Sequence, residues 1–427
     1  MDALSVAGES LWLNKQPTHS PVVHVTEFWM KQSQANLSSI GFVSTYPPTV
    51  CGLATFTAAL RAAMAGDRGS EEGLGVVSLG DARLEKSRPE VILQHVNGNR
   101  SSLREAVRVL NRHDIVVFQH EYGIYGGPDG DEILDFLSDL EVPTIVTLHT
   151  VLDKPTLRQK RILERIVDLA GQTVVMSDTA LRRLRNRYNL DADGVTMVPH
   201  GAMPELAIPG AANGPRPVAL TWGLIGPGKG LETALDAFAT VKDLQPLPRY
   251  VILGKTHPKV QAAQGDSYLD GLKAKVHALG LEDVVEFDNR YLDTDSLAAE
   301  IRQADLVLLP YESTEQVTSG VLVEALAAGK PVVATDFPHA VEMLGSGAGA
   351  LVPHSDPEAM ATALRSLFSE PGVAARMAAM ATSIGSTLHW PVVAAQYEAI
   401  ASTLVERQAL VSAFTSGRRA AGLAKVG

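Results

Sequence analysis

The segment that decides the fold runs from residue 306 to residue 334 and reads LVLLPYESTEQVTSGVLVEALAAGKPVVA. It begins and ends with short apolar, β-branched runs that are typical of buried strands. Between them a helix is expected to begin at Thr318 or Ser319, because either side chain can act as an N-cap. Gly329 is a natural helix stop, and Pro331 opens the next strand. A strand, a helix and a second strand in this order predict a βαβ unit and a parallel sheet.

The same alternation of strands and helices continues along the chain. In the first half, short β-branched runs predict six strands at Ile40–Ser44, Gly75–Leu79, Ile115–Phe118, Thr144–Leu148, Thr173–Met176 and Val195–Val198. In the second half, three more precede the two strands described above, at Val218–Thr221, Tyr250–Leu253 and Val284–Phe287. Helical patterns such as Ala54–Ala65 and Thr156–Ala170 lie between the strands. The chain is therefore predicted to be an α/β protein with two parallel sheets.

Prolines and glycines crowd the stretch Ala202–Pro217, so neither a helix nor a central strand can cross it. We interpret this stretch as an interdomain linker. The resulting division has an N-terminal extension at 1–37, a first Rossmann-like domain at 38–205, a linker at 206–217, a second Rossmann-like domain at 218–389, and a C-terminal helix and tail at 390–427.

The last segment carries a helical pattern over Val392–Val405, and Pro391 is expected to kink or restart the helix there. Two parallel-sheet domains in tandem place the carboxyl ends of both sheets around one crevice. Open α/β sheets generally bind their ligands at that edge. The cleft between the domains is therefore the expected site.

Composition limits the function classes. A chain of 427 residues, 45% of them hydrophobic, can bury two full cores. The formal charge of −11 argues against general nucleic-acid binding, and the basic residues Arg418, Arg419 and Lys425 are interpreted as a solvated end. No apolar run reaches the ~20 residues of a transmembrane helix, which leaves peripheral contact with a membrane open. The absence of a secretory pattern and the single cysteine, Cys51, favour a cytoplasmic location.

Two glycine-containing turns precede helical patterns and could bind an anion. Gly52 follows the first predicted strand, and backbone amides at a helix start attract phosphate. A plain strand-to-helix turn explains Gly52 equally well. In the second half, the residues WGLIGPGKG at 222–230 combine Gly228 with Lys229 ahead of a helix, which suits a diphosphate. The alternative is a surface lysine in a glycine turn, and no Ser or Thr follows Lys229 as a Walker loop requires.

Glu324 falls inside an otherwise apolar helical pattern. An ionised carboxylate in such surroundings needs hydrogen-bond partners, and the hydroxyl groups of a ligand would serve. The alternative places Glu324 on the solvent face of the helix.

Several histidines come directly after predicted strands. They are His120, followed by Glu121, His149, followed by Thr150, and His200. Each can be a structural histidine, but three at the cleft edge raise the expectation that one handles ligand protons or hydroxyls. Their spacing is not that of metal ligands, so no metal is expected.

Together these segments resemble the retaining GT-B glycosyltransferases of family four, which include the bacterial phosphatidylinositol mannosyltransferases. The likeness covers about Ile40 to Val405, and residues 324–334 look like that family's EAxAxGxPVVA signature. The resemblance implies two Rossmann-like domains around a cleft, and we expect the C-terminal helix to cross back to the first domain. It also implies a hexosyltransferase that moves a sugar from a UDP- or GDP-sugar to an acceptor hydroxyl with retention of configuration. The sugar nucleotide is then a co-substrate, and no cofactor is expected.

The resemblance also implies roles for single residues. Glu324 falls on the glutamate that binds the ribose hydroxyls, and Lys229 on the lysine that contacts the diphosphate. His149 falls on the histidine beside the donor sugar and the acceptor, so these three are the expected catalytic residues. The expected donor site contains Gly52, Gly228, Lys229, Lys255, Gln316, Ser319, Gly320, Val321 and Glu324. The expected acceptor side contains His120, Glu121, His149, Thr150 and His200.

Two positions depart from the family pattern. Gln316 stands where the family has a second glutamate, with Glu312 and Glu315 nearby, and an amide cannot carry the charge. Leu224 replaces a family arginine at the diphosphate site, a loss for which Lys255 or Arg290 could compensate.

Because of these two losses, the alternative of a non-catalytic protein that binds a nucleotide sugar or a partner protein stays open. A sugar phosphorylase or a nucleotide-sugar epimerase is the alternative within enzymes, although a phosphorylase using pyridoxal phosphate would need a Schiff-base lysine and a longer chain.

Overall fold

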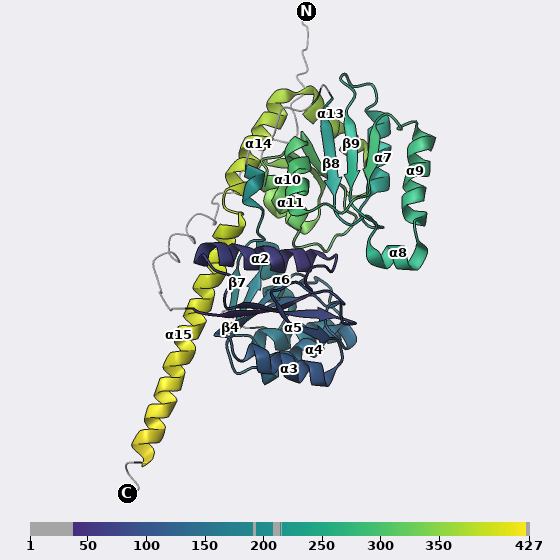
Figure 1. The fold of residues 1–427 in the computed structure, drawn as a ribbon. Helices are drawn as coiled ribbons and strands as arrows, with labels where there is room; N and C mark the ends of the chain where they lie inside the picture. The colour runs from purple at the N-terminus through teal and green to yellow at the C-terminus, as the bar shows by residue number, and fades with distance from the viewer. Residues whose placement is uncertain (1–36, 191–193, 208–213, 215, 424–427) are drawn as a thin grey trace, which may run out of the picture.

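A computed structural model of the chain has two lobes, each built on a parallel β-sheet with helices on both faces (Figure 1). The structure describes residues 37–190, 194–207, 214 and 216–423, and for residues 414–423 it describes the backbone alone. Each sheet carries one cluster of buried apolar side chains on either face. The predicted α/β class with two parallel sheets is confirmed.

The first sheet has seven strands in the order β3-β2-β1-β4-β5-β6-β7. Their bounds are β1 Ile40–Ser44, β2 Leu74–Gly80, β3 Val91–Val96, β4 Ile115–His120, β5 Thr144–Leu148, β6 Gln172–Val175 and β7 Val195–Met197. All six predicted strands are present. The sequence pattern missed β3, an edge strand that is only partly buried and contains Gln94 and His95. Its polar residues hide the apolar run on which strand prediction depends.

The second sheet has six strands in the order β10-β9-β8-β11-β12-β13. Their bounds are β8 Val218–Trp222, β9 Arg249–Leu253, β10 Val285–Asp288, β11 Leu306–Leu309, β12 Val332–Thr335 and β13 Gly349–Val352. The strand order reverses at β1 and β4 in one sheet and at β8 and β11 in the other. A crevice opens at such a switch point, outside the carboxyl ends of the strands.

Helices connect these strands. Those of the first lobe are α2 Gly52–Arg68, α3 Arg100–Leu110, α4 Glu132–Asp139, α5 Leu157–Leu169 and α6 Asp178–Arg187. Those of the second are α7 Leu231–Thr240, α8 Pro258–Gln264, α9 Ser267–Leu279, α10 Thr294–Gln303, α11 Gly320–Ala327, α12 Pro338–Leu344, α13 Pro357–Ser369 and α14 Pro371–Gly385. Ser319 caps α11 by accepting from the amide of Leu322, and Gly329 follows the helix with a φ of 63°, as its sequence predicted.

The last helix, α15 (Trp390–Leu423), starts beside the second lobe and runs along the first (Figure 1). Its residues Trp390, Val393, Ala394 and Tyr397 complete the core cluster that contains β1. The buried hydroxyls of Tyr397 and Thr147 lie 3.0 Å apart. The expected return of this helix to the first domain is confirmed, but the helix is longer than the predicted Val392–Val405. Pro391 lies in its first turn, where a proline is tolerated, so it starts the helix and does not kink it.

The chain passes between the lobes twice, and the two passages lie side by side. The amide of Ala202 donates to the carbonyl of Leu388 over 2.7 Å, and the amide of Trp390 donates to the carbonyl of Ala202 over 2.8 Å. Directly after the first passage, residues 204–207 form a short 3-10 helix, and its Leu206 packs into the core of the second lobe. Most of the predicted linker, 208–213 and 215, lies outside the described residues, so the domain boundaries stay predictions. No helix in the described ranges is both long and apolar enough to cross a bilayer.

Candidate active site

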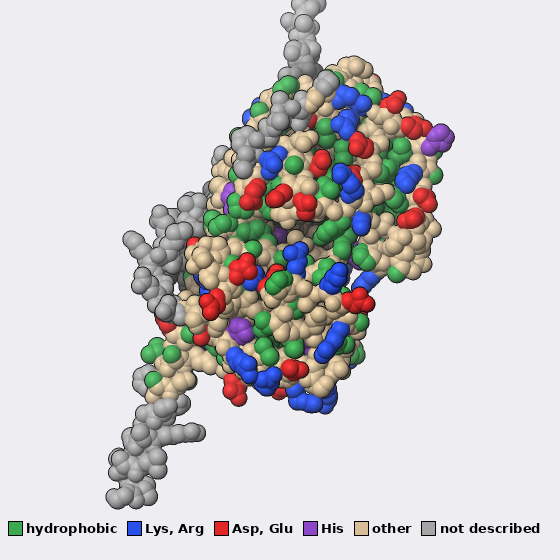
Figure 2. All heavy atoms as spheres, in the orientation of Figure 1, with side chains coloured by type: hydrophobic (Ala, Val, Ile, Leu, Met, Phe, Trp, Pro, Cys, Tyr) green, Lys and Arg blue, Asp and Glu red, His purple; other side chains and the backbone are tan. Residues whose placement is uncertain are grey.

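The loops that follow the strands of both sheets meet where the lobes adjoin. Figure 2 shows a furrow there, with basic side chains along its edge. A Cβ atom built on Gly320 of the second lobe would lie 2.9 Å from Nε2 of His200, which follows β7 of the first. The crevice predicted from tandem sheets is therefore lined by residues of both lobes.

The glycine loop between β8 and α7 is fixed against the loop that follows β11. The amide of Glu312 donates to the carbonyl of Gly228 over 3.0 Å. Gly230 has a φ of 65°, and a Cβ atom there would lie 1.7 Å from the carbonyl oxygen of Pro310. Because an L side chain rarely adopts this φ and has no room, residue 230 must be glycine. The loop is thus held at the edge of the furrow.

Lys229 supplies the positive charge of this loop. Its ammonium lies 4.3 Å from the centre of the Tyr311 ring, a cation–π contact that orients the side chain. Among the residues that the structure describes, Lys229 forms no ion pair with a carboxylate. The charge remains available to an anionic ligand.

Two cations were candidates to replace the arginine lost at Leu224. Lys255 follows β9 on a loop that pairs with the glycine loop, since its carbonyl accepts from the amide of Ile225 over 2.8 Å. Arg290 is engaged elsewhere, because its Nε lies 2.8 Å from Oδ1 of Asp288. The structure thus brings Lys255, and not Arg290, beside the loop of Lys229.

The start of α11 offers backbone donors. The amide of Ser319 donates to Nδ1 of His339 over 2.9 Å, and the Ser319 hydroxyl caps the helix. Ser319 therefore holds the helix start in place. The amides of Gly320 and Val321 lie in the first turn, where a helix provides no carbonyl to accept them. They are the donors that an anion at this end would meet.

Glu324 lies one turn further along α11. Oε2 of its carboxylate accepts from the indole nitrogen of Trp222 over 3.1 Å. Burial raises the pKa of Glu324 to about 7, and the hydrogen bond from Trp222 opposes that shift. The second oxygen is left for a further donor. The predicted interior carboxylate is thus half-buried and held by one indole, and does not sit on an open solvent face.

The residues near the missing family glutamate do not restore its charge. Gln316 turns its amide back on its own loop, with Nε2 3.1 Å from the carbonyl of Thr318. Glu315 points to the first lobe, where Oε2 lies 3.0 Å from the amide of Asp153 and 3.0 Å from Nη1 of Arg183. Glu312 is exposed. The nearby carboxylate of Glu315 is therefore already committed to an interdomain contact.

His149 directly follows β5 of the first lobe. Its Nε2 lies 2.7 Å from Oε1 of Gln119, so Nε2 carries the hydrogen and Nδ1 is left as an acceptor. Burial lowers the pKa of His149 to about 3, with smaller contributions from His200 and His120. The imidazole is neutral at ordinary pH. Its ring also packs edge-on against Phe56 of α2, with the ring centres 4.8 Å apart.

The remaining residues of the predicted acceptor side separate into three environments. His120 is fully buried, and burial lowers its pKa to about 4. Glu121 accepts a short hydrogen bond from the hydroxyl of Thr150, and burial raises the pKa of the carboxyl. His200 donates from Nδ1 to the carbonyl of Gly201 over 2.7 Å, which leaves Nε2 facing Gly320. His200 thus lies at the α11 start, nearer the expected donor side than its predicted grouping implies.

Gly52 is the first residue of α2, and a Cβ atom there would meet nothing within 4 Å. No packing contact inside the protein requires a glycine at this position. Phe56, one turn later, contacts His149, His200 and Trp390, and so connects the histidines to the start of α15. Among the described residues, no group of three or more His, Cys, Asp or Glu side chains is placed to hold a metal ion.

With this geometry in view, comparison with protein families matches residues 204–383 to the family described as glycosyl transferases group 1. Residues 204–383 contain the glycine loop, α11 and Glu324, which is the part of the chain whose sequence most resembled the family. The predicted resemblance is confirmed over these residues.

Two relatives of this chain carry the same name. It is 28% identical over 277 residues to a D-inositol 3-phosphate glycosyltransferase of Kineococcus radiotolerans, covering 56% of this chain and 61% of the relative. It is 29% identical over 269 residues to a D-inositol 3-phosphate glycosyltransferase of Corynebacterium glutamicum, covering 56% and 62%. The match thus spans about three fifths of each relative's length.

Solved structures share the architecture. HepE from Anabaena in complex with UDP superposes with a TM-score of 0.68 at 18% identity, covering 86% of this chain and all of that one. A sucrose-phosphate synthase from Thermosynechococcus elongatus gives a TM-score of 0.67 at 17% identity, covering 88% of this chain and all of that one. At these identities the likeness shows the fold, and it confirms the predicted GT-B architecture of this chain.

Three functional candidates in this chain were not apparent from sequence. Trp222, Phe56 and Arg183 act through partners that are distant along the chain, as the contacts above show. The one signal available was for Trp222, a tryptophan that ends a strand directly before the glycine loop. A buried indole nitrogen generally needs an acceptor, so a nearby carboxylate could have been sought.

Proposed function

We propose that the protein is a glycosyltransferase that moves a sugar from a nucleoside-diphosphate sugar, UDP- or GDP-linked, to an acceptor hydroxyl. One observation carries this proposal. The ammonium of Lys229, the first-turn amides of α11 and the half-buried carboxylate of Glu324 all belong to the second lobe, and a neutral His149 follows β5 of the first. Likeness to group 1 glycosyltransferases over residues 204–383 supports it.

The donor's diphosphate would lie between Lys229 and the start of α11. A lysine acts as a point charge, and the amides of Gly320 and Val321 supply directional donors. Lys255 stands on the adjoining loop and adds a second cation. Donors fixed in advance stabilise the charge that develops on the leaving diphosphate, which is the largest contribution that such a site can make.

Glu324 would bind the ribose. Its free oxygen can accept from a ribose hydroxyl, while Trp222 holds the other oxygen. The ionised carboxylate is the better acceptor, so binding should be stronger above a pH of about 7. Gln316 would contact the sugar through its side-chain carbonyl oxygen, because its amide nitrogen is used by Thr318.

His149 would act on the transferred sugar and the acceptor. Because Nε2–H donates to Gln119, the Nδ1 lone pair can accept a hydrogen bond from a hydroxyl of the transferred sugar or of the acceptor. We propose transfer with retention of configuration, which rests on the family resemblance. The relatives are named for D-inositol 3-phosphate, so this compound is the first acceptor to try. We propose a cytoplasmic location, in line with the single cysteine.

The test is incubation with a panel of UDP- and GDP-sugars, with and without D-inositol 3-phosphate, followed by chromatography of the released nucleotide and the product. Release of UDP or GDP that accelerates with acceptor is the expected result. Nucleotide-sugar binding with neither hydrolysis nor transfer across a broad acceptor panel would contradict the proposal and indicate a non-catalytic binding protein.

Lys229→Ala and Glu324→Ala test the donor site by calorimetry with UDP, GDP and the corresponding nucleosides. Lys229→Ala should weaken the nucleoside diphosphate by roughly 1.5–3 kcal/mol, the value of a charged hydrogen bond, and leave the nucleoside unaffected. Glu324→Ala should weaken both kinds of ligand, since both carry the ribose. Parent-like binding of the diphosphate by both variants would show that the nucleotide lies elsewhere.

A further inference from the structure

Helix α6 of the first lobe is joined to the second lobe by two carboxylates. Glu342 of α12 accepts from the backbone amides of Asp178 and Thr179, over 2.8 and 2.9 Å, at the start of α6. Glu315, on the loop after β11, meets Arg183 in the middle of α6. Both contacts join the lobes, but only the second involves the loop that carries Gln316.

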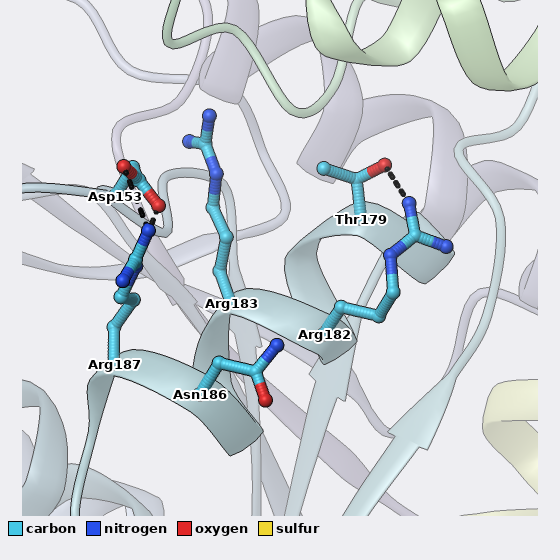
Figure 3. A pocket seen from close by; sticks show the side chains of 6 residues that line it. All are labelled: Asp153, Thr179, Arg182, Arg183, Asn186 and Arg187. Carbon is cyan, nitrogen blue, oxygen red and sulfur yellow. Dashed lines mark hydrogen bonds and ion pairs between the residues drawn. The ribbon is translucent and has the colours of Figure 1, made fainter.

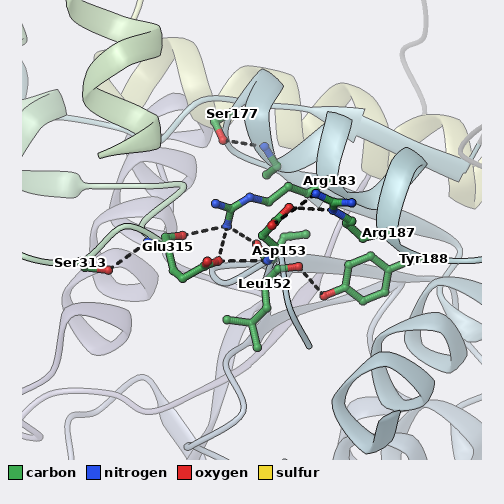
Figure 4. A network of polar contacts seen from close by, with 10 residues as sticks. Leu152, Asp153, Ser177, Arg183, Arg187, Tyr188, Ser313 and Glu315 are labelled. Atoms are coloured by element: carbon green, nitrogen blue, oxygen red, sulfur yellow. Dashed lines mark hydrogen bonds and ion pairs between the residues drawn. The ribbon is translucent and has the colours of Figure 1, made fainter. Parts of the chain in front are cut away.

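Arg183 joins three chain segments through one atom. Its Nη1 lies 2.9 Å from the carbonyl oxygen of Val151, 2.9 Å from the carbonyl oxygen of Glu315 and 3.0 Å from Oε2 of the Glu315 carboxylate. Figure 4 shows Arg183 and the Glu315 carboxylate pointing toward each other, with Asp153 beside them. The Arg183 side chain is 11% exposed and that of Glu315 is 40% exposed, so the arginine end of this charge-assisted contact is the end shielded from water.

The neighbouring arginines of α6 do not make this connection. Arg182, Arg183 and Arg187 line one pocket, and Figure 3 shows Arg183 extending away from the other two. Arg187 pairs with Asp153 of the first lobe, with Nε 2.7 Å from Oδ1. Arg182 contacts Asp178 and Thr179 of its own helix. Of the three, Arg183 alone contacts the second lobe in the described part of the chain.

The two segments that Arg183 joins carry the two sides of the proposed reaction. Val151 follows His149 and Thr150 at the end of β5, and Glu315 directly precedes Gln316. We propose that Arg183 is a positioning residue for glycosyl transfer, which sets the donor loop at 311–318 against the loop at 149–153. This inference rests on the proposed function. Catalytic groups must be held within about 0.5 Å of their productive positions, and a largely buried cation between the two loops can do this.

A positioning role predicts which kinetic constant changes. Lys229 and Glu324 both lie in the second lobe, so a nucleoside diphosphate can bind without the contact through Arg183. The distance between the donor sugar and His149, in contrast, depends on the contact that Arg183 makes between the two loops. Removal of Arg183 should therefore lower kcat and leave nucleoside diphosphate affinity nearly unchanged.

The experiment measures kcat, KM for the nucleotide sugar and the Kd of the nucleoside diphosphate for Arg183→Gln, Arg183→Lys and Glu315→Gln. Arg183→Gln and Glu315→Gln should lower kcat about tenfold or more and change Kd less than about twofold. Arg183→Lys should recover part of kcat, because it keeps the charge but not the planar fork. The double variant Arg183→Gln with Glu315→Gln should lower kcat by less than the product of the two single effects, since the two side chains share the contact between them.

Two controls separate positioning from loosening of the structure. Arg187→Gln removes an arginine one turn further along α6 that pairs with Asp153 within the first lobe and makes no hydrogen bond to the loop at 311–318 among the described residues, so its kcat should fall much less than that of Arg183→Gln. Glu342→Gln weakens the other contact between the lobes without touching the donor loop, and its kcat should fall much less than that of Arg183→Gln. An equal fall in Glu342→Gln would assign the effect to the interface in general and overturn the positioning role.

Hydrogen exchange provides a readout that does not need activity. In the free protein, Arg183→Gln should speed amide exchange at 151–153 and 312–318, and Arg187→Gln should leave 312–318 unchanged. If the parent neither transfers nor hydrolyses any donor, the proposed function fails, while exchange still reports whether Arg183 joins the loops. Unchanged exchange, or a lower melting temperature with kcat and KM like the parent, would overturn the inference. If Arg183→Gln does not fold, Glu315→Gln carries the same test.

Discussion

Trp222 and Glu324 show how one hydrogen bond can set the chemistry of a carboxyl group. Burial favours the protonated form of Glu324, and the indole N–H favours the ionised form. The balance puts the pKa at about 7, close to the pH at which the group would have to accept from a ribose. Nucleotide binding should thus depend on pH within the ordinary working range.

The first prediction concerns this dependence. In the parent, affinity for UDP or GDP should increase as the pH rises through about 7, because the ionised carboxylate is the better acceptor. Trp222→Phe removes the indole donor that stabilises the ionised form, so the midpoint should move to higher pH. Calorimetry across this pH range measures nucleotide affinity in the parent and in Trp222→Phe. Glu324→Gln is the control, in which the contribution of this carboxyl to the pH dependence should be absent. A parent affinity that is flat across neutral pH would contradict the assignment of Glu324.

The second prediction concerns His149. If its Nδ1 accepts from a reacting hydroxyl, His149→Ala should lower kcat by about 10²-fold and leave nucleoside diphosphate affinity nearly intact. Because burial lowers its pKa to about 3, His149 itself should add no inflection to the pH profile of kcat above pH 5. The exposed His277 of α9 is the control, because His120 is fully buried and His200 faces α11. Undiminished turnover by a folded His149→Ala variant would exclude the role.

Sequence alone identified the residues that are unusual among their immediate sequence neighbours. Glu324 stood out as a charge in an apolar helix, and Lys229 as a cation in a glycine turn before a helix. Arg183 could not be recognised, since it is one of several arginines in α6 and only its partner Glu315, 132 residues away, distinguishes it. The same reason explains why the contact between the Glu315 carboxylate and the first lobe was not apparent from sequence.

At the scale of elements, the apolar strands were predictable and the short or polar ones were not. β1, β4 and β5 are continuous buried runs that periodicity detects. β3 is a partly exposed edge strand, and β13 has four residues that begin with a glycine, so neither shows a clear pattern. These two strands are held by pairing with β2 and β12, which a single sequence does not reveal.

The third prediction concerns the glycine loop. Gly230→Ala should destabilise the protein by about 2 kcal/mol or more, because the residue would need a left-handed φ and its Cβ would overlap the carbonyl of Pro310. Nucleoside diphosphate affinity should fall with it, since the loop that carries Lys229 would shift. Denaturant unfolding and calorimetry measure the two effects. Gly52→Ala is the control for stability, because a Cβ there meets nothing, and a change below about 0.5 kcal/mol is expected. Equal stability of both variants would contradict the steric argument.

At the scale of the whole molecule, α15 unites the two lobes. It begins where residues 388–390 pair with Ala202 and then packs against β1 and α2 of the first lobe. The core of the first lobe therefore includes residues that follow the whole second lobe in the sequence. The two lobes should unfold together, even though each has its own sheet.

The fourth prediction follows from this packing. Tyr397→Ala should lower the free energy of unfolding by about 3–5 kcal/mol, as expected for a fully buried aromatic side chain. Tyr397→Phe should cost about 1 kcal/mol, since it removes only the hydrogen bond to Thr147. Calorimetry of the full chain gives both values and shows whether one transition or two occur. A Tyr397→Ala variant as stable as Tyr397→Phe would contradict the buried position of this ring.

The return of α15 also sets the order in which the protein can be completed on the ribosome. The strands of the first lobe are synthesised early, but the residues that cover β1 and Phe56 begin at Trp390. The intervening residues 204–389 take roughly 10–40 s to add at about 5–20 residues per second. Throughout that time an apolar surface on the nascent first lobe has no permanent cover. We therefore expect the core of the first lobe to close only after the start of α15 has been synthesised.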